Sequence, residues 1–127
     1  PVAALIVDPQ GRIVAEAVNR READGDPTAH AEVLALRAAA KIVGDGWRLE
    51  GCTLVVTLEP CTMCAGAAVG ARIKRIVFGA LEPKTGGCGS LVDIPRAPGA
   101  TYTPEVVGGV LEEQCAAVLE TFFQEKR

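Results

Sequence analysis

Apolar runs and apolar positions at helical spacing alternate along this chain. Short runs of the kind that form buried strands occupy residues 2–7, 12–18, 53–58 and 75–78. Segments with apolar residues three or four apart, or rich in small helix-forming residues, predict helices at residues 29–43, 61–71 and 111–123. Because strands and helices alternate, the pattern predicts an α/β fold, a three-layer α/β/α sandwich.

The connections between these segments carry recognisable turn chemistry. Residues 8–11 (Asp-Pro-Gln-Gly) join the first two strands into a predicted hairpin. Residues 20–27 form a polar loop that leads to the first long helix, where Asp26 and Thr28 are candidate caps. Residues 79–105 are rich in Gly and Pro and predict a long loop, which in a compact domain is usually functional.

Length and charge narrow the class of protein. A chain of 127 residues is expected to form one domain, residues 1–127, with a core large enough to need no disulfide bonds. The net charge of -3 means that contact with a nucleic acid would depend on a local basic patch. No apolar run is long enough to span a bilayer and no signal-peptide pattern is visible, so we expect a cytoplasmic protein with no membrane contact.

Five cysteines and a single histidine define the candidate chemistry. An odd number of cysteines without a secretory context argues against a disulfide framework and favours a metal site. His30, Cys61 and Cys64 can hold one zinc ion and leave its fourth position to water, as in catalytic sites. A redox Cys-x-x-Cys pair and a closed structural zinc site are the alternatives. A fourth protein ligand would come from the remaining cysteines: Cys88 could reach, Cys52 is carried away by a strand, and Cys115 fits a core position.

Glu32 supplies a candidate proton carrier beside this metal site. Residues i and i+2 point to nearly opposite sides of a helix, so His30 and Glu32 can share a site only at the helix entrance. Cys61 and Cys64 share one face at the start of another predicted helix. The positive ends of both helix dipoles would favour thiolates and a hydroxide. Zinc lowers the pKa of its bound water to about 7, and Glu32 can take the proton, so the arrangement suits hydrolytic deamination of an amidine-like carbon.

Several motifs resemble those of one family. His-Ala-Glu followed by Pro-Cys-Thr-Met-Cys matches the signature of the zinc nucleobase deaminases, which are cytidine and deoxycytidylate deaminase-like. The wider sequence resembles the bacterial tRNA-specific adenosine deaminases nearly end to end, on DPTAHAE at 26–32, VTLEPCTMCAG at 56–66, VFGA at 77–80, KTG at 84–86 and GS at 89–90.

This resemblance implies an activity and a set of roles. It implies a homodimer with a cytidine deaminase-like mixed sheet and a Zn²⁺ cofactor, which converts adenosine to inosine at the wobble position of a tRNA anticodon. His30, Cys61 and Cys64 would be the zinc ligands and Glu32 the proton shuttle. Asn19 would contact the target base, although an ordinary turn residue is the other interpretation of that position. The small-residue helix after Cys64 would form the dimer surface.

The chain also departs from the family pattern. Family members begin with an extra helix before the first strand, whereas this sequence starts at that strand; either the helix was trimmed or this is a compact variant, and we expect one sheet face to be less covered without it. Residues 101–103 (Thr-Tyr-Thr) stand where the family carries Asn-His-Arg. Basic residues are few, and the group at Arg72, Lys74 and Arg75 would either contact phosphates or form a solvated strand start. Phe122 and Phe123 would either stack on a base or belong to the core.

Two other functions fit the same metal site. One is deamination of a free nucleobase or nucleoside, such as guanine or cytosine, or of single-stranded DNA. The other is a non-catalytic, zinc-stabilised binding module. These hypotheses differ in the substrate that they predict, and the anticodon stem-loop of tRNA is the first candidate.

Overall fold

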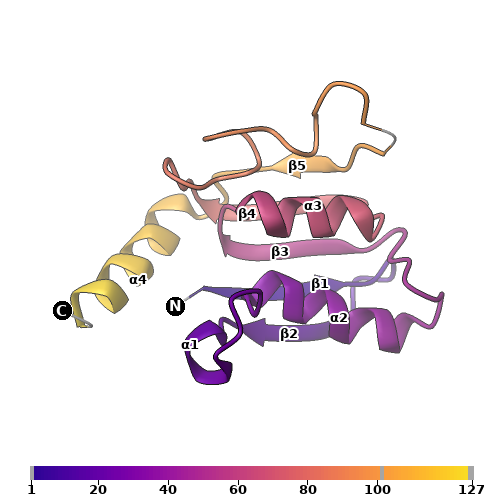
Figure 1. Cartoon of the computed structure of the whole chain (residues 1–127), viewed down its shortest axis with the longest axis horizontal. Helices are drawn as coiled ribbons and strands as arrows, with labels where there is room; N and C mark the ends of the chain where they lie inside the picture. The colour runs from indigo at the N-terminus through magenta and orange to yellow at the C-terminus, as the bar shows by residue number, and fades with distance from the viewer. Residues whose placement is uncertain (1, 101, 126–127) are drawn as a thin grey trace.

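A five-stranded mixed sheet forms the centre of the protein (Figure 1). The computed structural model describes residues 2–100 and 102–125, with side chains except those of 118 and 120–125. The strand order is β2-β1-β3-β4-β5, with bounds Ala3–Val7 (β1), Ile13–Val18 (β2), Thr53–Leu58 (β3), Arg75–Ala80 (β4) and Glu105–Val107 (β5). β1 pairs antiparallel with β2 and β3, whereas β3, β4 and β5 are parallel. The mixed α/β sheet expected from the sequence is confirmed.

The register of the strands builds the core. Ile6 of β1 lies opposite Leu54 of β3, and Leu54 lies opposite Ile76 of β4. All three side chains are fully buried. Because every second residue of a strand points to the same face, this row directs the apolar side chains of three strands to one face of the sheet. That face receives the two helices that carry the candidate site.

Helices α2 (Ala31–Val43) and α3 (Thr62–Gly70) cover this face. α2 packs on β1 and β2 and lies against α3. Their buried positions are mostly alanines, which let the helices approach the sheet closely: Ala31, Ala35, Ala39, Ala65 and Ala68. Gly44 ends α2 in the left-handed conformation with φ 77°, as expected for a glycine stop. Among the described residues, no helix is long and apolar enough to cross a membrane.

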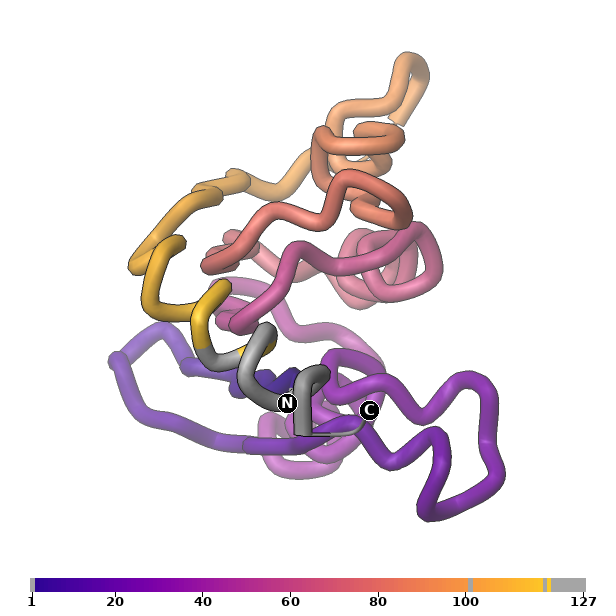
Figure 2. Tube along the Cα trace, turned by 90° about the vertical axis from the view of Figure 1, so that its left-hand side faces the viewer, coloured from indigo at the N-terminus to yellow at the C-terminus, as the bar shows by residue number. Residues whose placement is uncertain are grey.

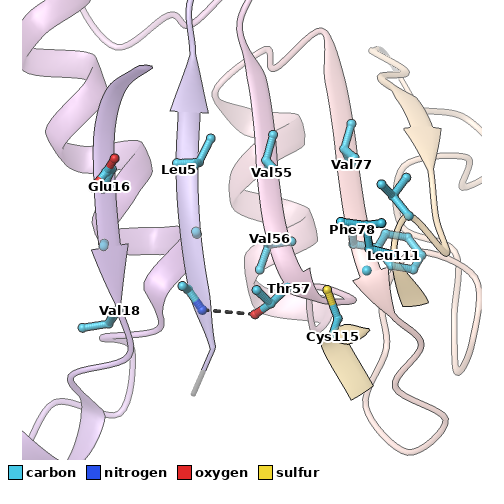
Figure 3. A pocket seen from close by; sticks show the side chains of 15 residues that line it. Leu5, Glu16, Val18, Val55, Val56, Thr57, Val77, Phe78, Leu111 and Cys115 are labelled. Atoms are coloured by element: carbon cyan, nitrogen blue, oxygen red, sulfur yellow. Dashed lines mark hydrogen bonds between the residues drawn. The ribbon is translucent and has the colours of Figure 1, made fainter. Parts of the chain in front are cut away.

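The opposite face of the sheet is only partly covered. Helix α4 (Glu112–Glu125) packs there on β4 and β3, which completes the third layer. Beside it lies an apolar groove of about 610 Å³ lined by residues of β1, β2, β3 and β4 together with Leu111 and Cys115 (Figure 3). The sequence predicts that β1 is buried on both faces. Instead its residues alternate between buried and half-buried, because α4 lies over the β3 and β4 side of the sheet.

Three local expectations need correction. Residues 20–27 contain a short helix, α1 (Arg21–Asp24), and the guanidinium of its N-cap residue Arg20 donates to the Asp24 carboxylate at 2.9 Å. Asp26 and Thr28 do not cap α2, because the Asp26 carboxylate accepts from the Thr28 backbone N–H within its own turn. The sequence predicts no strand at β5, since three residues at a sheet edge carry too short a pattern.

The hairpin turn is as predicted, and the long connection is shorter than predicted. The Asp8 carboxylate accepts from the backbone N–H groups of Gln10 and Arg12, both at 2.9 Å. β4 extends to Ala80, so the connection to β5 covers residues 81–104. Figure 2 shows the chain moving across the sheet, with the N-terminal strands at one side and this connection at the other.

Candidate metal centre and active site

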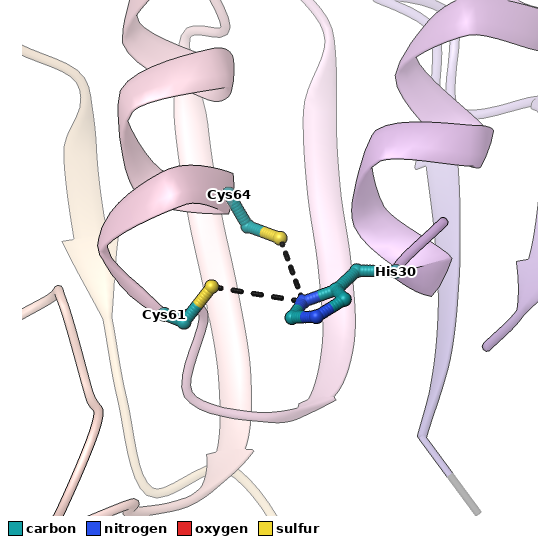
Figure 4. A group of neighbouring side chains, drawn as sticks. All are labelled: His30, Cys61 and Cys64. Carbon is teal, nitrogen blue, oxygen red and sulfur yellow. Dashed lines mark hydrogen bonds between the residues drawn. The ribbon is translucent and has the colours of Figure 1, made fainter. Parts of the chain in front are cut away.

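The three predicted metal ligands meet at the starts of two helices (Figure 4). His30 is the N-cap residue of α2, and Cys61 is the N-cap residue of α3. Cys64 lies in the first turn of α3 and is fully buried. The His30 Nδ1 atom lies 3.6 Å from Cys61 Sγ and 3.4 Å from Cys64 Sγ. Residues more than thirty positions apart are therefore brought to one point.

The spacing of these atoms fits a tetrahedral zinc site. With zinc–nitrogen and zinc–sulfur bonds of the usual lengths, two ligand atoms at tetrahedral corners lie about 3.6 Å apart. The observed separations of 3.6 and 3.4 Å match this value without any movement of the side chains. One imidazole nitrogen and two sulfurs are also donors that zinc prefers. The residues present thus fit a zinc ion.

The two sulfurs differ in acidity because they lie close together. A hydrogen bond from Cys64 lowers the pKa of Cys61 to about 5. The same contact raises the pKa of Cys64, and burial raises it further. Both sulfurs lie at the positive end of the α3 dipole, which stabilises negative charge. A bound cation would stabilise negative charge on the sulfurs further and keep both as thiolates.

Glu32 lies beside this cluster and is not one of its members. It belongs to the first turn of α2 and is 4 % exposed. Burial raises the pKa of its carboxyl group above the ordinary value. A carboxyl group with a raised pKa holds a proton more readily than an exposed one, which suits a group that carries protons.

The remaining cysteines stand apart from the cluster. Within the described part of the chain, the cluster consists of His30, Cys61 and Cys64 alone. Cys52 is fully buried in the core and Cys88 is also buried, and burial raises the pKa of the Cys88 thiol to about 12. Cys115 lines the apolar groove on the opposite sheet face. This arrangement favours an open fourth position over a closed structural site.

Asn19 follows β2 and is exposed next to the start of α2. Its side-chain oxygen accepts from the Arg21 backbone N–H at 2.8 Å, so it serves the turn that begins α1. The next residue, Arg20, donates its backbone N–H to the carbonyl oxygen of Ala29 at 2.9 Å. The backbone next to Asn19 therefore lies against the residue that precedes His30. The side chains of Phe122 and Phe123 lie outside those described.

The basic residues considered for phosphate contact lie at the far end of α3. Arg72 donates to the carbonyl oxygens of Val69 and Gly70, and its guanidinium lies 5.5 Å from the ring centroids of both Trp47 and Tyr102. Arg75 pairs with the exposed carboxylate of Glu105 at 2.9 Å. The two arginines therefore have structural contacts at the end of α3 opposite to the metal ligands.

Sequence reasoning assigned no role to Glu59, which is 2 % exposed. Its carboxylate accepts from the backbone N–H groups of Glu82, Cys88 and Ser90 at 3.1, 3.0 and 3.1 Å, and from the Ser90 hydroxyl. Burial alone would raise the pKa of Glu59, but these donors together hold it below its ordinary value. An acidic residue directly before Pro-Cys, at the end of a buried strand, was the sequence signal for this site.

Comparison with known proteins adds a family to this geometry. The model of the cytidine and deoxycytidylate deaminase zinc-binding region matches residues 1–80. The chain is 48% identical to a tRNA-specific adenosine deaminase of Bacillus subtilis over 127 residues, covering all of this chain and 78% of that protein. It is 50% identical to the tRNA-specific adenosine deaminase of Haemophilus influenzae over 127 residues, covering all of this chain and 73% of that protein.

A solved structure agrees with these relatives. A structure from work on A-to-I editing by tRNA A34 deaminases at the wobble position superposes with a TM-score of 0.87 at 42% identity. The match covers 93% of this chain and 84% of that one. Fold and sequence similarity thus point to the same group of proteins.

Metal binding can be tested with single substitutions. We expect His30→Ala, Cys61→Ser and Cys64→Ser each to reduce bound zinc from one ion per chain to well below one, because each removes one of three ligands. Cys88→Ser is the matched control and should keep its zinc. Elemental analysis of the purified proteins measures this, and loss of zinc from Cys88→Ser would contradict the three-ligand site.

Proposed function

Because the chain belongs to the family of zinc-binding cytidine and deoxycytidylate deaminases, we propose that it deaminates adenosine to inosine in RNA. The substrate we propose is the wobble adenosine of a tRNA anticodon, the substrate class of its close relatives. The observation that carries this proposal is a three-ligand metal cluster beside a buried carboxylate that is not a ligand. The enzyme is a hydrolase acting on an amidine C–N bond.

The chain's own residues divide the work of the reaction. His30, Cys61 and Cys64 would hold the zinc ion. The His30 Nδ1 atom already lies 3.6 Å from Cys61 Sγ and 3.4 Å from Cys64 Sγ. When bound, zinc supplies a water made acidic enough to attack at neutral pH. The N-termini of α2 and α3 face this point and stabilise negative charge that develops there. The overall change converts adenosine and water into inosine and ammonia.

Glu32 moves the protons in this proposal. Its carboxylate accepts a proton from the attacking water and passes it to the ring nitrogen beside C6, then takes the proton of the hydroxyl group now on C6 and passes it to the departing amine. Its burial raises its pKa, which helps the protonated form to persist between these transfers. Because Glu32 lies outside the ligand cluster, its removal should stop proton transfer without removing the metal.

Asn19 is our candidate for contact with the target base. Its exposed position at the end of β2, linked through Arg20 to Ala29, holds it beside the histidine ligand. An amide can pair with the edge of a base, and the NH₂ group not used in the turn is the donor in this case. A tRNA substrate would also place the activity in the cytoplasm.

An anticodon stem-loop tests the proposed substrate. We expect the zinc-loaded protein to form inosine at the wobble position, read by mass spectrometry or by sequencing. Guanine, cytidine and a single-stranded DNA of the same loop sequence are the competing substrates, and turnover should be at least about a hundredfold lower with each. Turnover of a free base without inosine in the stem-loop would contradict the tRNA proposal and favour the alternative deaminase activity.

Substitution of Glu32 separates catalysis from metal binding. We expect Glu32→Ala to lower inosine formation by a factor of about 10² to 10⁴ or more, because a general acid–base is lost. Zinc content and the thermal unfolding midpoint are measured on the same sample. Glu22→Ala, at an exposed glutamate of α1, is the control and should remain active. Undiminished function in Glu32→Ala would instead favour a non-catalytic binding module.

We also propose that the protein is a homodimer through the outer face of α3. Thr62, Met63, Gly66 and Gly70 are exposed along this helix, and Met63 is 36 % exposed. A Cβ atom added at Gly66 or Gly70 would have no neighbour within 4 Å outside the helix's own backbone, so the face is open in the isolated chain. Flat faces of small residues let two helices approach closely.

A lysine at Gly66 tests this interface. Within one chain a Cβ atom at this position meets no neighbour, and lysine has a higher helix propensity than glycine, so stability should be unchanged or rise by up to about 1 kcal/mol. In a dimer it would bury a charge, so we expect Gly66→Lys to sediment as a monomer in analytical ultracentrifugation. Ala38→Lys, at an exposed position of α2, is the control. A dimer that persists in Gly66→Lys would place the interface elsewhere.

A further inference from the structure

Residues 82–90 are folded directly onto the metal-binding turn. Gly86 forms an isolated β-bridge with Cys61, and the Gly87 backbone N–H donates to the Pro60 carbonyl oxygen at 2.7 Å. The buried Cys88 belongs to the same core cluster as Ala31 and Ala65, neighbours in sequence of the ligands His30 and Cys64. The segment is therefore a direct neighbour of the site.

The approach is so close that only glycine fits at two positions. A Cβ atom at Gly86 would lie 2.4 Å from the carboxyl carbon of Glu59. A Cβ atom at Gly87 would lie 2.9 Å from the backbone carbonyl carbon of Cys61. The backbone at Gly86 thus lies against the Glu59 carboxylate, and the backbone at Gly87 lies against the metal-binding turn. Neither contact leaves room for a side chain.

The group beneath this segment must be an acceptor only. Three backbone N–H groups and the Ser90 hydroxyl all donate to the two oxygens of Glu59. An ionised carboxylate accepts hydrogen bonds at both oxygens, whereas a glutamine would turn an NH₂ group toward some of the same donors. A buried donor left facing another donor costs more than the loss of an ordinary hydrogen bond.

We propose that Glu59 is a positioning residue whose buried carboxylate ties residues 82–90 onto the metal-binding turn, so that this segment is a fixed wall of the substrate site. This inference rests on the proposed deaminase function. Glu59 acts through the segment and not on the reacting atoms. Lys84 and Leu91, within and just after the segment, are exposed.

Amide hydrogen exchange of the zinc-loaded protein tests the tether directly. We expect exchange in residues 82–90 to be at least about a hundredfold faster in Glu59→Gln, which removes several hydrogen bonds to the buried carboxylate. In Ser90→Ala, which removes one of them, we expect it to be about tenfold faster. Zinc should stay at one ion per chain in both. Glu50→Gln, at an exposed glutamate, is the matched control and should exchange like the wild type.

Kinetics on the anticodon stem-loop provide the second measurement. We expect KM to rise at least about tenfold in Glu59→Gln while kcat stays within a few-fold, because the metal ligands and Glu32 remain in place. Unchanged exchange in residues 82–90, or loss of zinc from folded Glu59→Gln, would overturn the tether. If Glu59→Gln does not fold, Ser90→Ala decides: its exchange must rise locally. A wild-type protein that forms no inosine would refute the proposed function, and exchange and zinc content would still decide the role of Glu59.

Discussion

Three donor atoms from two helices must converge within a few ångström, and the rest of the structure depends on this convergence. His30 and Cys61 are the N-cap residues of α2 and α3, so the position of each helix start is also the position of a ligand. β3 fixes the start of α3 because its register is set on both sides, by β1 and by β4. The start of α2 is fixed by the alanine-rich contacts that this helix makes with the sheet and with α3. A shift in either would break the ligand geometry.

Two buried carboxylates flank this centre and differ in their surroundings. Glu32 lies where burial dominates, and its pKa is raised. Glu59 is at least as deeply buried, yet the donors of residues 82–90 bring its pKa below the ordinary value. The first carboxyl group is suited to carry protons and the second to remain an anion that organises backbone. The pKa values of two residues of one chemical type thus shift in opposite directions, because the surroundings of Glu59 supply hydrogen-bond donors that those of Glu32 lack.

Elements with long or strong patterns were predictable from the sequence, and short ones were not. The strand at residues 53–58 agrees with β3 residue for residue, and the helix at 29–43 differs from α2 only at its start. The short helix α1 and the edge strand β5 were missed, because four or three residues carry too little periodicity. β5 exists through pairing with β4, a partner far from it in sequence. The half-open face of β1 was also unpredictable, since its local pattern does not say where α4 packs.

The sequence by itself determined the fold class, the zinc ligands to expect and the candidate acid–base. It could do so because residue type and spacing already restrict them: one histidine, a close cysteine pair and a glutamate two positions from the histidine leave few arrangements. Only the tertiary structure revealed the hydrogen bonds that Glu59 accepts, and the contacts that Arg72 and Arg75 make with Trp47, Tyr102 and Glu105. Both depend on contacts between residues distant in the chain. Such contacts are set by the register of the sheet and the packing of the helices, which no local pattern encodes.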